Sequence, residues 1–304
     1  DMIIKSALKL ISDTYAPSIL TLSTFESGTR AEESSRRAVD SSRDLKTNPF
    51  IELYEEVLLP SEQWNQLDVV GISIIGISQI IPGLTLARML REKYPHLHIT
   101  LGGPIFSVTA GQLEKRPEFF RDFCHSVITF EGEEPMHQLL TRLKNGDSLA
   151  DSPNLIYLNR DKIHKTEKRV ELRFEDVPPP TFDGLPMNLY LSPFPILPVL
   201  QSRGCYWGKC TFCTHSYVYG HRYGKQRTKQ MVDELERLSK TYNTRYFTFS
   251  DEAVSPHALN DVSEEILERE LDVRSLALLK FEKIMDHKLF AKVRQAGFIF
   301  LMFG

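Results

Sequence analysis

The chain has few cysteines and none of the features of a secreted or membrane protein. Its 304 residues include four cysteines and two tryptophans, and no apolar run approaches the roughly 18 residues that a membrane-spanning helix needs. The N-terminal sequence DMIIKSALKL lacks the basic start, apolar core and small-residue cleavage site of a secretion signal. These absences predict a cytoplasmic protein without a membrane partner, in a compartment where thiols stay reduced.

The charge is nearly balanced, with 37 basic and 40 acidic residues and a formal net charge of −3. Such a balance gives no indication of a nucleic-acid partner, so none is expected. The content of 41% hydrophobic and 25% charged residues is typical of globular proteins. A chain of this length can form two domains whose cores need no disulfide for stability, so the cysteines require another explanation.

The first half of the chain alternates between strand and helix patterns. After a mostly helical, polar start over residues 1–60, DVVGISII is a short apolar run typical of a buried strand, and GLTLARMLREKY has helical spacing. The segments HLHITLGGP and HSVITFEGEEPMHQLLTRLKNG supply two further strands and a helix. This alternation predicts an α/β domain over residues 1–150 with a parallel, doubly wound sheet, which binds ligands at the carboxyl ends of its strands.

The second half predicts a linker followed by part of a barrel. Residues 151–195 contain a hairpin pattern and then many prolines, which interrupt regular elements. Residues 196–304 hold four strands with intervening helices, the pattern of the first half of a TIM-type (β/α) barrel. Because exposed parallel strand edges are unusual at a terminus, we expect a fragment truncated within the barrel, and trimmed also at its start, since no first strand is evident before residue 60.

Three of the four cysteines lie within nine positions of the segment QSRGCYWGKCTFCTHS. Cys205, Cys210 and Cys213 have the spacing C-x4-C-x2-C, so their thiolates can turn toward one metal centre. A disulfide would leave an odd thiol, and unligated cysteines are more often scattered through apolar segments. A structural zinc site completed by His215 or His221 stays open beside an iron–sulfur cluster. The loop follows the first strand of a βα series, where barrels place their chemistry, and this position favours a catalytic cluster.

The segment SRGCYWGKCTFC resembles the cluster loop of radical SAM enzymes, whose usual motif is C-x3-C-x2-C after the first barrel strand. The resemblance implies that the three cysteines bind a [4Fe–4S] cluster, whose fourth iron binds S-adenosylmethionine (SAM). Reductive cleavage of SAM then gives a 5′-deoxyadenosyl radical. Phe212 occupies the aromatic position before the last cysteine. The first gap is one residue longer than usual, a departure that the flexible Gly208 can absorb.

Charged side chains follow the next two strands of this half. Asp251 and Glu252 stand where the resemblance implies a contact with the amino group of SAM, and capping of the following helix is the alternative. Lys280 and Glu282 would contact SAM or substrate if they face the barrel interior, and solvated surface charges are an equal expectation. Three side chains after the cysteine loop are further candidates for substrate contact: His215, Tyr217 and His221.

Glycine and serine residues end the strands of the first domain. Gly102 and Gly103 permit close approach of a bulky ligand, and Ser73 and Ser78 offer hydroxyls, although ordinary turns have the same composition. The order of segments over roughly residues 65–304 resembles the cobalamin-binding class of radical SAM proteins. That resemblance implies a Rossmann-like, flavodoxin-like domain with cobalamin near these residues. The same contact is implied for the next turn, which consists of Glu131, Gly132 and Glu133.

The resemblance also implies an activity. Members of this class methylate unactivated carbons of peptides or natural products, using one SAM for the radical and another as the methyl donor to cobalamin. The D-x-H-x-x-G motif is absent, which implies cobalamin bound without a histidine ligand. A small-molecule or peptide substrate and an electron donor such as flavodoxin or ferredoxin are expected. A narrower similarity, in NPFIELYEEVLLP and DVVGISI, is to radical SAM proteins of ribosomal-peptide maturation. A non-methylating rearrangement and a zinc-stabilised binding module stay open as alternatives.

Overall fold

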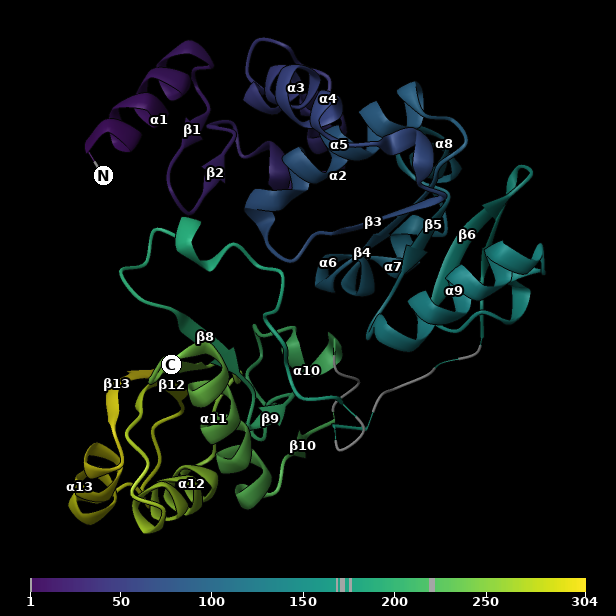
Figure 1. Cartoon of the computed structure of the whole chain (residues 1–304). Coiled ribbons are helices and arrows are strands. Elements are labelled where there is room, and N and C mark those ends of the chain that lie inside the picture. Colours follow the sequence, from purple (N-terminus) through teal and green to yellow (C-terminus); the bar gives the residue numbers. More distant parts are fainter. Residues whose placement is uncertain (1, 168, 170–172, 175–176, 219–221) are drawn as a thin grey trace. The chain divides into compact units, whose positions relative to one another are not determined.

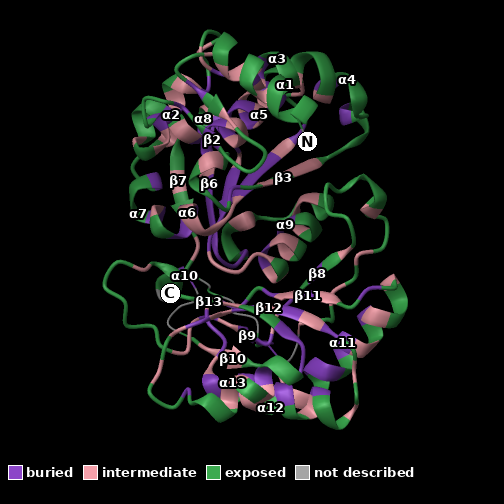
Figure 2. Cartoon of the chain, turned by 90° about the vertical axis from the view of Figure 1, so that its left-hand side faces the viewer, coloured by how far each residue is buried: buried purple, intermediate pink, exposed green. Residues whose placement is uncertain are grey.

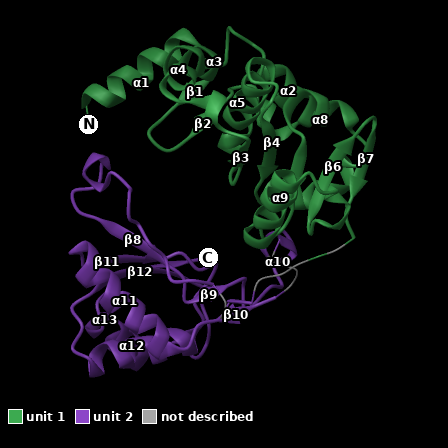
Figure 3. Cartoon of the chain, turned by 45° about the vertical axis from the view of Figure 1, so that its right-hand side comes forward, with its two compact units in different colours: residues 1–171 green, residues 172–304 purple. Residues whose placement is uncertain are grey.

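The computed structural model describes residues 2–167, 169, 173–174, 177–218 and 222–304. The chain divides into two compact units, residues 1–171 and 172–304 (Figure 3). The first unit extends past residue 150 because the hairpin in the expected linker pairs with its sheet. In the described parts of the chain, no helix has the length and apolar character that crossing a membrane requires.

Short helical segments precede the main sheet of the first unit (Figure 1). They are α1 (Met2–Thr14), η1 (Ala31–Glu33), α2 (Ser35–Ser41), α3 (Pro49–Leu53), the π-helical turn η2 (Tyr54–Leu58), α4 (Leu59–Ser61) and η3 (Trp64–Gln66). Two short strands, β1 (Ile19–Leu20) and β2 (Phe25–Glu26), pair with each other. Within the described residues, no strand before Val69 joins the main sheet.

The main sheet of the first unit has the order β3-β4-β5-β6-β7. Its strands are β3 (Val69–Ser73), β4 (His98–Gly102), β5 (Ser126–Ile128), β6 (Leu155–Asn159) and β7 (Lys162–Lys165). The first three strands are parallel, as the alternating pattern predicts, whereas β6 and β7 add an antiparallel edge. The order is sequential, so the described sheet contains no switch in strand order.

Helices cover both faces of this sheet. The connecting segments are η4 (Ile77–Gln79), α5 (Ile80–Lys93), α6 (Pro104–Val108), α7 (Ala110–Leu113), α8 (Pro117–Phe123), α9 (Glu133–Asn145) and η5 (Leu149–Asp151). Apolar residues of α5 and α8 pack with Val127 of β5 in one cluster, and α9 packs through Leu139 with Ile128 in another. Because neighbouring residues of a strand face opposite sides, the sheet lies between two helical layers. Gly146 ends α9 in a left-handed conformation with φ of 73°.

The second unit contains a sheet of four parallel strands in the order β13-β12-β11-β8. The elements are η7 (Met187–Leu189), β8 (Ile196–Val199), β9 (Ser202–Arg203), α10 (His215–Val218), β10 (Gly224–Lys225), α11 (Thr228–Tyr242), β11 (Tyr246–Phe249), α12 (Pro256–Glu268), β12 (Arg274–Leu279), α13 (His287–Gln295) and β13 (Phe298–Phe303). Strands and helices alternate as the sequence predicts. The short strands β9 and β10 form a separate antiparallel pair.

One face of this four-stranded sheet is buried against helices and the other is more open (Figure 2). Leu197, Val199, Phe247 and Phe249 alternate along β8 and β11 with more exposed residues, and they pack with apolar residues of α11, α12 and α13. Among the described strands, β13 pairs with β12 alone. The loop with the three cysteines leaves the sheet at the carboxyl end of β8.

Candidate functional site

The base of the cysteine loop is fixed by backbone and amide hydrogen bonds. Pairing of β9 with β10 is extended by Gln226, whose N–H donates to the Gln201 carbonyl at 2.9 Å. The side-chain amides of Gln201 and Gln226 donate at 3.0 Å to the carbonyls of Gln226 and Leu200. Gly204 has φ of 83°, and a Cβ there would lie 2.1 Å from the Arg222 carbonyl oxygen. The position before Cys205 therefore requires glycine.

The three cysteines of the loop are free thiols with different exposure. Cys205 and Cys213 are half-buried and Cys210 is exposed. The Cys213 N–H donates to the Cys210 carbonyl at 3.2 Å, so these two residues share a tight turn. Phe212 is 88% exposed, so its ring is not packed in the core of the second unit.

Three unpaired thiols on one loop fit a cluster or metal centre by the chemistry of their donor atoms. Across the described residues, however, no three His, Cys, Asp or Glu side chains are gathered closely enough to hold a metal ion. The Nδ1 atom of His215 lies 3.0 Å from Oε1 of Glu252, so this histidine pairs with a carboxylate. His221, the other expected zinc ligand, lies outside the described residues. Tyr217 is exposed on α10.

Asp251 and Glu252, just past β11, have different surroundings. Asp251 is 3% exposed and accepts hydrogen bonds from the N–H groups of Gln201 and Ser202. Burial raises the pKa of this carboxyl to about 6, against the opposing effect of these hydrogen bonds. Glu252 is partly exposed and contacts His215. Neither residue caps α12, because the side chain of Ser255 accepts from the Ala258 N–H there.

Lys280 and Glu282, which follow β12, contact the cysteine loop itself. The Tyr206 hydroxyl donates to Oε1 of Glu282 at 2.6 Å. The Lys280 ammonium lies 3.9 Å from the ring centroid of Trp207 and 3.7 Å from Glu282. Burial and the Glu282 hydrogen bond raise the pKa of Tyr206. The segment between Cys205 and Cys210, which is one residue longer than usual, therefore contacts the residues that follow β12.

The strand ends of the first unit bring several expected ligand contacts to one edge of the sheet. Ser73 pairs in register with Gly102, so these residues lie side by side at the ends of β3 and β4. A Cβ on Gly102 would approach no atom closer than 3.9 Å, which leaves room for a ligand. At Gly103, where φ is 120°, a Cβ would lie 2.1 Å from the Ile74 carbonyl oxygen. The close approach at Gly103 is therefore to the protein's own backbone.

The turn after β5 lies at the same edge because β5 is parallel to β4. The Phe130 N–H donates to the Ser107 hydroxyl at 2.6 Å, and the Asn154 side chain donates to the Glu131 carbonyl at 3.3 Å. Gly132 directly precedes Glu133, the first residue of α9. Ser78 lies in η4 and is half-buried. Ile75 and Ile77 are 68% and 60% exposed beside it, an apolar border that the sequence reasoning did not include.

Sequence reasoning also missed a histidine pair at the opposite edge of this sheet. The rings of His98 and His125 stack with centroids 5.0 Å apart, near the amino ends of β4 and β5. The Nε2 atom of His98 lies 2.9 Å from the Ser126 hydroxyl, and the Arg91 guanidinium lies 2.7 Å from Nε2 of His125. Burial, reinforced by the positive charge of Arg91, lowers the pKa of His98 to about 4 and that of His125 to about 3. Burial raises the pKa of the neighbouring Cys124 thiol.

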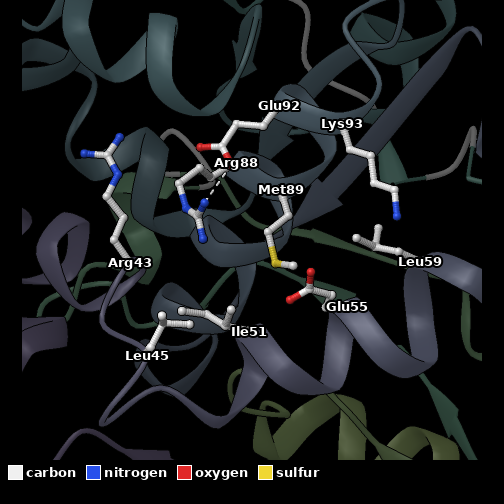
Figure 4. A pocket seen from close by; sticks show the side chains of 9 residues that line it. All are labelled: Arg43, Leu45, Ile51, Glu55, Leu59, Arg88, Met89, Glu92 and Lys93. Carbon is white, nitrogen blue, oxygen red and sulfur yellow. Dashed lines mark hydrogen bonds and ion pairs between the residues drawn. The ribbon is translucent and has the colours of Figure 1, made fainter.

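A cavity of about 430 Å³ in the first unit lies between the helices before the sheet and α5 (Figure 4). Ile51, Leu59 and Met89 give it an apolar side, and Arg88 binds Glu92 at 2.8 Å along its border. None of the residues expected from the sequence to bind a ligand lines this cavity.

Comparisons with known proteins identify distant relatives of this chain. No protein-family model matches the chain. It is 26% identical over 215 residues to an uncharacterised methyltransferase of Pyrococcus horikoshii, covering 68% of this chain and 44% of the relative. It is 23% identical over 273 residues to the anaerobic magnesium-protoporphyrin IX monomethyl ester cyclase of Rubrivivax gelatinosus, covering 84% and 47%. The chain thus spans less than half the length of these relatives.

Two solved structures have a similar fold. The radical SAM methyltransferase TsrM from Kitasatospora setae, with tryptophan and a SAM analogue bound, matches with a TM-score of 0.63 and 18% identity over 84% of this chain and 52% of that chain. The cobalamin-dependent radical SAM enzyme OxsB, with aqua-cobalamin and SAM bound, matches with a TM-score of 0.58 and 20% identity, over 84% and 37%. The chain has a mixed α/β fold like that of cobalamin-dependent radical SAM enzymes, and the resemblance expected from its cysteine motif is confirmed.

Proposed function

We propose that the chain is part of a cobalamin-dependent radical SAM methyltransferase. Its first unit would be the Rossmann-like cobalamin-binding domain, and its second unit the first half of the (β/α) barrel. The observation that carries the proposal is the set of three free thiols on one loop at the carboxyl end of β8. The relatives support it, because a methyltransferase and cobalamin-dependent radical enzymes are among them.

Each cofactor has candidate residues in the chain. Cys205, Cys210 and Cys213 would hold the [4Fe–4S] cluster, and Glu252, whose side chain is partly exposed, would contact the amino group of SAM. Cobalamin would lie at the strand edge formed by Ser73 and Gly102, with Ser78 and the turn 131–133 beside it. When bound, the reduced cluster supplies the electron that cleaves SAM, and cobalamin carries the methyl group. The loop base and the Tyr206–Glu282 bond orient the cluster loop relative to β12.

The substrate we propose is an unactivated carbon of a peptide or other natural product, with flavodoxin or ferredoxin as the electron donor. The similarity to ribosomal-peptide maturation proteins favours the peptide. A methyltransferase of the proposed type, which uses one SAM for the radical and another as the methyl donor, consumes two SAM molecules for each methylated product and gives 5′-deoxyadenosine and S-adenosylhomocysteine. A radical rearrangement would give no S-adenosylhomocysteine, so chromatography of these two nucleosides separates the reactions.

Metal and corrin analysis of the full-length protein, purified anaerobically with cobalamin supplied, tests the assignment. We expect iron and sulfide near about four each, broad absorption around ~400 nm that dithionite bleaches, and bound corrin. Cys210→Ala should lose the iron. The matched control is Cys124→Ala, which removes the one cysteine outside the loop, a thiol buried in the core of the first unit. One equivalent of zinc with neither colour nor corrin would overturn the proposal in favour of a structural metal site.

A further inference from the structure

The carboxylate of Asp251 lies against the base of the cysteine loop. Its Oδ2 atom accepts from the Gln201 N–H at 3.0 Å, and Oδ1 accepts from the Ser202 N–H at 2.6 Å and from the Ser202 hydroxyl. Asp251 is 3% exposed, and Gln201 and Ser202 are each 1% exposed. The carboxylate is therefore enclosed by the protein and fully engaged with the loop base.

These contacts hold the chain at the point where it leaves β8. Parallel pairing aligns Phe249 of β11 with Val199 of β8, so Asp251 arrives at the same level of the sheet as Gln201. Gln226 fixes the other side of Gln201 through backbone and side-chain hydrogen bonds. The loop base is thus bound from both neighbouring segments, whereas Cys210 beyond it is exposed.

The chemistry of this contact requires an ionised carboxylate. Three donors converge on it, and only a group with two acceptor oxygens can satisfy all three. In an asparagine at this position, the amide NH2 would face one of the donors, leaving a buried N–H group without an acceptor. Glutamate has both oxygens but is longer by one methylene, so it would restore the acceptors at a shifted position.

We propose that Asp251 is a positioning residue that fixes the start of the cysteine loop for cluster binding. This inference rests on the proposed function. Burial distinguishes two adjacent carboxylates. Asp251 is 3% exposed and engaged with the loop base, whereas the side chain of Glu252, proposed above to contact SAM, is 23% exposed and pairs with His215. Loss of Asp251 should therefore weaken the loop, and loss of Glu252 should weaken SAM binding.

Hydrogen exchange on the full-length protein without cluster provides the first test. In Asp251→Asn we expect the amides of residues 201–202 to exchange about tenfold faster, while those of β12 keep their parental rates. Glu252→Gln, the matched control, should leave the amides of residues 201–202 unchanged. Ser202→Ala removes only the hydroxyl donor and should give a smaller acceleration, which keeps the test decisive if Asp251→Asn fails to fold. Unchanged exchange in both Asp251→Asn and Ser202→Ala would overturn the proposal.

The reconstituted protein provides the second test. Asp251→Asn should release iron to a chelator about tenfold faster than the parent, while its remaining cluster keeps the SAM-induced change in the electron paramagnetic resonance spectrum. Glu252→Gln should keep its iron and require more SAM for that change, and Asp251→Glu should recover part of the iron retention. Normal iron retention with weakened SAM binding in Asp251→Asn would make Asp251 a SAM contact and overturn the inference. A parent protein that takes up no iron would refute the proposed function instead, even where the hydrogen-exchange result holds.

Discussion

Acidification should destabilise the first unit through the stacked pair His98 and His125. Burial and Arg91 lower the pKa of His98 from 6.5 to about 4, and that of His125 to about 3. Because the unfolded chain then binds protons more readily than the folded chain, stability is complete above the unfolded pKa of 6.5. It is lost progressively as the pH falls toward the folded pKa.

The magnitude follows from the interval between the two pKa values. For His98, the change from 6.5 to about 4 corresponds to about 3 kcal/mol of unfolding free energy. About 2 kcal/mol of this is lost between pH 7 and pH 5. The lowered pKa of His125 also makes the first unit less stable in acid. Because both rings interact with Arg91, the free-energy contributions of His98 and His125 are not summed.

Tryptophan fluorescence during urea unfolding can measure the unfolding free energy of the first unit alone. Trp64 is buried in the core of the first unit, and Trp207→Phe removes the signal of the second. In this background, His98→Gln keeps a polar group near Ser126 but cannot titrate, so it should lose about 2 kcal/mol less than the parent between pH 7 and pH 5. His96→Gln, at an exposed position, is the control. Equal losses in His98→Gln and the parent would refute the reasoning.

Two further predictions concern glycine geometry and the loop contact with β12. Gly103→Ala should destabilise the first unit by at least about 3 kcal/mol, since φ of 120° and the Ile74 carbonyl exclude a Cβ. Gly102→Ala should cost under about 1 kcal/mol and lower cobalamin affinity. Urea unfolding measures the two stabilities, and corrin titration measures the cobalamin affinity. Equal stabilities of Gly103→Ala and Gly102→Ala would contradict the prediction for Gly103. Tyr206→Phe should destabilise the loop by about 1–2 kcal/mol through loss of the Glu282 bond. Unchanged hydrogen exchange over residues 203–210 would disprove that contact.

The regular elements could be predicted because their apolar patterns are strong. Apolar runs such as those of β3 and β11, each followed by an amphipathic helix, indicate the alternation of strand and helix without reference to distant residues. The hairpin of β6 and β7 was recognised as a local pattern, but its membership of the sheet was not. Pairing with β5 depends on contacts across the fold, and the prolines that follow the hairpin concealed it.

The cysteine motif could be recognised from residue type and spacing alone, and its assignment as a cluster site stays a prediction. The roles of Asp251 and Gly103 could not be recognised in this way, because each depends on a backbone segment that is distant in sequence. The histidine pair had a signal that could have been read. His98 and His125 each stand at the start of an apolar strand, and adjacent parallel strands bring such positions together.

The contact between Asp251 and Gln201 joins residues that are 50 positions apart. Closing so long a segment carries an entropic cost, which the packing of α11 and β11 against β8 helps to offset. The start of the cysteine loop therefore acquires these hydrogen bonds only where β11 lies beside β8. On a growing chain, the hydrogen bonds at the start of this loop cannot be complete before residue 251 has been synthesised.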